Sequence, residues 1–89
     1  MNDTQSKKSA AVVIEARKSL GLNIADMVRL CDVPRSTWDG WERGERAPDR
    51  AALRLLEVLV LLHRDDRAAY RRFADATVRA NVQEGKKDD

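Results

Sequence analysis

The sequence has little of what disulfide, zinc and catalytic sites are made of. Its 89 residues include a single cysteine, Cys31, and a single histidine, His63. One cysteine cannot form an intramolecular disulfide, and a lone thiol fits a reducing compartment. A zinc site needs several cysteine or histidine ligands at suitable spacing, and catalysis needs a nucleophile with a base or a pair of carboxylates. We find none of these patterns, so we expect no metal, no cofactor and no enzymatic activity.

The sequence also lacks a signal peptide and an apolar segment long enough to cross a bilayer. Its only hydrophobic run covers residues 53–62 and contains Arg54 and Glu57. We therefore expect a cytoplasmic protein without a membrane partner. The formal net charge is only +2, which is weak evidence for a nucleic-acid partner, so such a function must depend on where the charges lie.

What the sequence does contain is a pair of short helical patterns separated by a turn. Asn23 is a good N-cap, and apolar residues then recur at the spacing of one helical face, which predicts a helix over about residues 24–30. Asp32 follows where the chain must reverse, and aspartate tolerates the positive φ that such a position often requires. The sequence therefore predicts a tight turn directly after this helix.

A second helix is expected over residues 35–42. Pro34 has a φ suited to the start of a helix. Gly44 ends the helix in the left-handed conformation that glycine adopts cheaply, and Pro48 cannot continue it. Two short helices joined by a tight turn are the arrangement of a helix-turn-helix DNA-binding motif.

A first helix is expected before this motif, over residues 9–20. Its inner face contains Val12 or Val13, together with Ala16 and Leu20.

A fourth helix is expected after its cap Asp49, and a fifth over about residues 66–81. Apolar residues of the fourth helix cover more than one stripe of a helical wheel, which exceeds the needs of one small core. The polar segments 1–8 and 83–89 lack apolar periodicity, and we interpret them as flexible tails. The chain is thus expected to form one domain over residues 9–82, with no strand.

Several of these residues together resemble the Cro-like or Xre-like helix-turn-helix regulators, which share the fold of the phage repressors. The resemblance covers about residues 11–62. It is carried by Arg17, Leu20-Gly21-Leu22, Asn23, Val33, Arg35-Ser36-Thr37 and Trp41-Glu42-Arg43-Gly44 with Pro48. It implies an all-α, five-helix bundle of the phage-repressor type that binds double-stranded DNA.

Three positions depart from the family pattern. Ile24 stands where the family has a phosphate-binding Gln, Asp32 replaces the turn Gly, and Pro34 replaces the usual Ser or Thr cap. The fold tolerates all three changes. A side-chain contact with phosphate is not expected from Ile24.

In this fold the second helix of the motif enters the major groove, and side chains near its N-terminus face the base edges. The resemblance assigns base reading to Arg35, Ser36, Asp39 and Gly40. Arg35 can bond guanine O6 and N7 together, whereas Asp39 could accept from cytosine N4 or instead orient Arg35. Gly40 is expected on the exposed face, where a missing side chain would allow close approach to DNA. The plainer alternative is a solvated helix start and a neutral glycine.

Phosphate contacts are expected from residues that flank the groove: Asn23, Thr37, Arg43, Arg46 and Arg50. Each of these arginines has an ordinary alternative as a solvated surface residue. Arg17 and Glu42 resemble the internal ion pair of the family, which ties the first helix to the end of the recognition helix. Trp38 and Trp41 are expected in the core.

The surplus apolar surface predicts a homodimer with an interface at Leu55, Val58, Leu62, Tyr70 and Phe73. We therefore expect a homodimeric repressor that binds an inverted repeat and controls its own or a neighbouring operon in a phage or mobile element, such as an anti-CRISPR operon. Antitoxins and restriction-modification controller proteins have the same shape. The rival hypothesis is an antitoxin-like protein whose primary role is to neutralise a partner protein. No small-molecule ligand is indicated.

Overall fold

The structure, a computed structural model, describes the backbone of residues 2–88 and the side chains of residues 6–77. Within that range the chain forms five helices and no strand: α1 (Asn2–Leu20), α2 (Ile24–Cys31), α3 (Arg35–Glu42), α4 (Arg50–Asp65) and α5 (Arg67–Asp88). The all-α prediction and the expected order of helices are confirmed.

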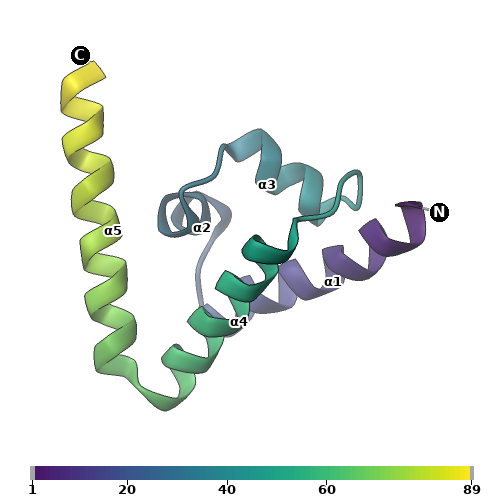
Figure 1. The fold of residues 1–89 in the computed structure, drawn as a ribbon, viewed down its shortest axis with the longest axis horizontal. Coiled ribbons are helices and arrows are strands. Elements are labelled where there is room, and N and C mark those ends of the chain that lie inside the picture. The colour runs from purple at the N-terminus through teal and green to yellow at the C-terminus, as the bar shows by residue number, and fades with distance from the viewer. Residues whose placement is uncertain (1, 89) are drawn as a thin grey trace.

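The helices pack around α1 and α2. Helix α1 packs against α3 and α4, α2 packs against α3 and α5, and α4 packs against α5. Figure 1 shows that α4 and α5 meet at a sharp elbow, so that α5 returns along the side of α2 that faces away from α3. The short helices α2 and α3 are therefore supported from behind by the longer ones.

The core is formed by apolar side chains from every helix. Its buried members are Val13, Ala16, Leu20, Met27, Leu30, Trp38, Trp41, Leu56, Leu59 and Tyr70. Both tryptophans are buried as expected, and Trp38 has no exposed surface. On α1 it is Val13 that faces the core, whereas Val12 is 49% exposed, which decides between the two alternatives left open by the sequence.

The helix ends follow the local signals of the sequence. Asn23 Oδ1 accepts a hydrogen bond of 2.8 Å from the backbone N–H of Asp26, and Asp49 caps α4 in the same way. Asp32 has a φ of 57° and Gly44 a φ of 74°, as the two turns were expected to require. The boundaries of α2 and α3 consequently agree with the prediction to within one residue.

Helix α1 is longer than expected, because it begins at Asn2 instead of near Ser9. Ser6 and Ser9 are buried, and a Cβ at Gly44 would lie only 3.7 Å from Lys7 Cα. The N-terminal turns thus pack against the turn after α3. This contact relies on small polar residues, which apolar periodicity does not detect.

Helix α5 also extends beyond its expected end, to Asp88. Residues 83–88 contain Gly85 but no proline, so no residue there blocks continuation of the helix. The mobility assigned to segments 1–8 and 83–89 stays a prediction, because most of their side chains lie outside the described residues. No described helix combines the length and the apolar character needed to span a membrane.

Candidate functional site

The site predicted from the sequence centres on α3 and the turn that joins it to α2. The backbone N–H groups of Asp32 and Val33 both donate to the carbonyl of Val28, and Asp32 is in the left-handed conformation. These bonds end α2 and redirect the chain within three residues. The turn therefore sets the angle at which α3 leaves α2.

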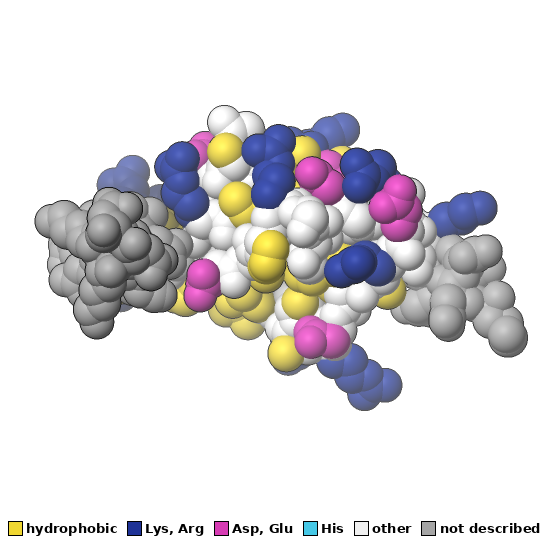
Figure 2. All heavy atoms as spheres, turned by 90° about the horizontal axis from the view of Figure 1, so that it is seen from above, with side chains coloured by type: hydrophobic (Ala, Val, Ile, Leu, Met, Phe, Trp, Pro, Cys, Tyr) yellow, Lys and Arg dark blue, Asp and Glu magenta, His cyan; other side chains and the backbone are white. Residues whose placement is uncertain are grey.

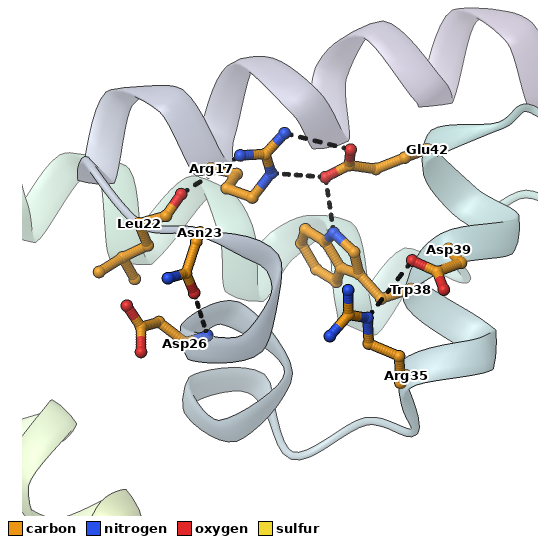
Figure 3. Close-up of polar contacts among 8 residues, drawn as sticks. All are labelled: Arg17, Leu22, Asn23, Asp26, Arg35, Trp38, Asp39 and Glu42. Atoms are coloured by element: carbon orange, nitrogen blue, oxygen red, sulfur yellow. Dashed lines mark hydrogen bonds and ion pairs between the residues drawn. The ribbon is translucent and has the colours of Figure 1, made fainter.

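A polar network fixes the rear of α3 to α1. Arg17 donates from Nε to Glu42 Oε2 at 2.7 Å and from a second nitrogen to Oε1 at 3.2 Å. Its third nitrogen donates to the carbonyl of Leu22 at 3.3 Å, at the start of the segment that leads into α2 (Figure 3). The ion pair expected between Arg17 and Glu42 is thus present and joins α1 to α3, while the bond to Leu22 ties Arg17 to the loop between α1 and α2.

Glu42 accepts one further hydrogen bond, which the sequence did not indicate. Trp38 Nε1 donates to Glu42 Oε2 at 2.7 Å (Figure 3). Burial by itself would raise the pKa of Glu42, but the hydrogen bonds from Arg17 and Trp38, together with the positive charges of Arg17 and Lys18, outweigh it, and the pKa lies below its ordinary value. The Glu42 carboxylate is therefore held in its ionised form between the indole of Trp38 and the guanidinium of Arg17.

The opposite face of α3 is open to solvent near its N-terminus. Arg35 and Ser36 are exposed, and Asp39 is half-buried. Arg35 Nε lies 3.7 Å from Asp39 Oδ1, one turn along the helix (Figure 3). The structure thus brings together two of the side chains that were expected to read bases. Of the two roles considered for Asp39, this distance favours orienting Arg35.

Gly40 does not lie on the open surface, and that part of the prediction was wrong. It is buried although it follows Ser36 by one helical turn. The cause is Arg46, whose Cγ would lie 3.0 Å from a Cβ built at position 40. A side chain from the loop after α3 therefore covers the place where backbone was expected to approach DNA. Nothing in the periodicity of α3 signals this cover.

The residues expected to contact phosphate differ in their surroundings. Asn23 uses its side-chain oxygen as the N-cap of α2, and Thr37 is half-buried. Arg43 pairs with Glu45 at 3.2 Å, and Arg50 is exposed at the start of α4. Figure 2 shows the side of the molecule that lies uppermost in Figure 1, where basic side chains stand beside acidic ones. The surface is thus mixed in sign and not uniformly basic.

The apolar residues expected at a dimer interface separate into two groups. Val58 and Phe73 are exposed, at 45% and 37%, and Leu55 and Leu62 are partly buried against the core. Tyr70, by contrast, is buried within the monomer and has little surface to offer a second copy, and its place at an interface stays a prediction. Its ring meets His63 edge to face, with centroids 4.9 Å apart. Tyr70 is buried because α5 turns back onto α2.

Cys31 is the last residue of α2. It is half-buried and borders a hollow of about 290 Å³ lined in part by Val33, Trp41 and Leu55. Burial raises the pKa of its thiol to about 11, so the reactive thiolate is scarce at neutral pH. Within the described residues, no group of three or more His, Cys, Asp or Glu side chains is placed to hold a metal ion.

No protein-family model, no curated protein and no solved structure matches the chain.

Proposed function

We propose that the protein is a sequence-specific DNA-binding regulator of transcription that acts as a homodimer on an inverted repeat. The observation that carries this proposal is the position of α3. Its N-terminal side chains Arg35 and Ser36 are exposed, while Glu42 at its other end is bonded to α1. A helix held rigidly from behind with a free polar edge suits the major groove, which admits one α-helix.

Base reading belongs to the exposed edge of α3. The side chain of Arg35 is 61% exposed, and its Nε lies 3.7 Å from Asp39 Oδ1. Such an exposed pair contributes little free energy. Arg35 can therefore exchange this contact for two hydrogen bonds to a guanine edge, with Asp39 limiting its rotation.

Phosphate contacts belong to the rim of the same surface. The N-terminus of α2 presents backbone N–H groups beside Asn23, which suits an anionic backbone. Arg43 lies directly after α3 and Arg50 is the first residue of α4, and both are exposed. These groups would set the position of α3 along the groove without reading sequence.

A second copy of the chain is expected at the apolar surface of α4 and α5. Val58 is exposed in a stripe with Leu55 and Leu62, and Phe73 is exposed on α5. Burying this surface in a two-fold contact would remove apolar area from water at about 25 cal/mol for each Å². The two α3 helices would then meet successive turns of the groove, about 34 Å apart. Such a dimer suits repression of its own or a neighbouring operon.

Selection of bound fragments from a random DNA pool tests this function. The expected result is one enriched motif with two-fold symmetry and half-sites about one helical turn apart. An unenriched pool, with binding equal on all sequences, would contradict it. In that case a pull-down with the product of the adjacent gene tests the antitoxin-like alternative directly.

A further inference from the structure

Position 40 lies on the same side of α3 as the exposed Ser36. An α-helix turns by about 100° per residue. Gly40 is therefore nearly in line with Ser36 and points away from the arc occupied by Trp38 and Trp41. A side chain at position 40 would stand on the open face of the helix. Gly40 is nevertheless buried.

The cover over Gly40 is the stem of Arg46. Three Arg46 atoms, Cγ, Cδ and Nε, would lie 3.0, 3.2 and 3.3 Å from a Cβ built at position 40. The loop is held there by its backbone, because the N–H groups of Glu45 and Arg46 both donate to the Gly40 carbonyl, at 2.9 and 3.4 Å. Arg46 thus occupies the place that a side chain on residue 40 would fill.

The guanidinium of Arg46, like that of Arg50, has no partner among the described residues, unlike those of two other arginines nearby. Arg35 is paired with Asp39, and Arg43 is paired with Glu45. Among the residues that the structure describes, Arg46 is exposed and has no ion pair or side-chain hydrogen bond. Its stem is positioned on α3 while the donors of its guanidinium remain unused.

We propose that Arg46 reads a base in the major groove, in place of the missing side chain at position 40. The proposal rests on the proposed DNA-binding function and changes the expected role of Arg46 from phosphate contact to base contact. A guanidinium presents a planar pair of donors that matches guanine O6 and N7. Gly40 is then a positioning residue, because a side chain there would require Arg46 to shift from its place on α3.

Binding measurements on a set of sites test this assignment. Wild type, Arg46→Ala, Arg46→Lys and Gly40→Ala are compared on the selected site and on sites in which each base pair is replaced in turn. Arg46→Ala should abolish discrimination at one base pair per half-site, a loss of about 5- to 150-fold, and leave the other positions unchanged. Arg46→Lys should lose part of the same discrimination, because the ammonium can still donate to O6 and N7 but lacks the planar pair of donors.

Gly40→Ala provides a second and independent variant. The three atoms nearest to the added methyl group all belong to the flexible side chain of Arg46, and alanine favours a helix over glycine. Thermal unfolding should therefore be unchanged or raised, while discrimination at the same base pair falls. Arg43→Ala is the matched control, and it should weaken binding to every site by the same factor.

Each contrary result has a separate meaning. If Arg46→Ala weakens all sites by the same factor, Arg46 is a phosphate contact, and the base-reading proposal fails although the DNA-binding function stands. If Gly40→Ala leaves discrimination intact, the positioning role of Gly40 is wrong. If wild type prefers no site, the proposed function fails and the reading role of Arg46 fails with it.

Discussion

Trp38 and Glu42 are joined by a hydrogen bond of 2.7 Å, from the indole Nε1 to the same carboxylate oxygen that accepts from Arg17. The bond spans one turn of α3. It links a side chain with no exposed surface to an ion pair whose side chains are 21% and 13% exposed. The core and the contact with α1 therefore act together to hold α3 in one orientation.

We predict that Glu42→Gln lowers the free energy of unfolding by about 1–3 kcal/mol. This is the usual cost of removing one partner of a hydrogen bond and leaving the other partner unsatisfied. Glutamine retains one acceptor oxygen but leaves Arg17 without its counter-charge. Urea denaturation measures the change. Glu45→Gln is the control, because Glu45 is exposed and pairs with the exposed Arg43, and it should shift stability by no more than about 0.5 kcal/mol.

Wild type and Glu42→Gln can also be compared as a function of pH. The pKa of Glu42 lies below its ordinary value, so its ionised form stabilises the fold at pH values above the ordinary pKa, and this contribution is lost as the pH falls through the lowered pKa. The stability difference between wild type and Glu42→Gln should hold above about pH 5 and shrink as the solution is acidified. A difference that is constant down to pH 2 would contradict the lowered pKa.

Arg35→Ala should reduce affinity for the selected site by about 1–3 kcal/mol and reduce affinity for random DNA much less, because the lost contact is to a base. Fluorescence anisotropy on both DNAs measures the two losses. Arg64→Ala is the matched control. Arg64 is an exposed arginine paired with Asp65 at the elbow before α5, and its removal should change neither value. If Arg35→Ala loses equal affinity for both DNAs, Arg35 contacts phosphate and not a base.

Binding should weaken steeply with salt even though the net charge is only +2, since each phosphate contact releases a counterion. The slope of log affinity against log salt measures the number of contacts. Arg43→Ala or Arg50→Ala should each flatten it by about one unit. An affinity that does not change with salt would argue against a DNA backbone contact and for a protein partner.

Local rules explain why so much of α2 and α3 could be predicted. Asn23, Asp32 and Gly44 act through their own backbone or the next turn, so sequence spacing is enough to place them. The Arg46 cover of Gly40 could not be predicted, because it depends on how an irregular loop folds back after the helix. The burial of Tyr70 could not be predicted either. The apolar residues of α5 show that one face is covered, but which helix covers it depends on the angle between α4 and α5.

The partly buried Leu62 packs against the core, so a charge there would disturb the monomer as well as an interface. The dimer is better tested at its exposed residues, Val58 and Phe73. Val58→Glu and Phe73→Glu should each convert the dimer to a monomer, since a charge would be buried without a partner in the two-fold contact. Analytical ultracentrifugation gives the mass, and circular dichroism checks that the monomer is folded.

Leu61→Glu is the matched control for this experiment. Leu61 is 48% exposed on α4, but it lines a groove shared with Val12 of α1 and lies outside the predicted stripe. It should therefore remain dimeric and bind the inverted repeat like wild type. If Leu61→Glu alone becomes monomeric, the two-fold contact lies at the groove between α1 and α4. If the wild type is a monomer at micromolar concentration, the two α3 helices are not coupled, and the preference for an inverted repeat should disappear in the selection as well.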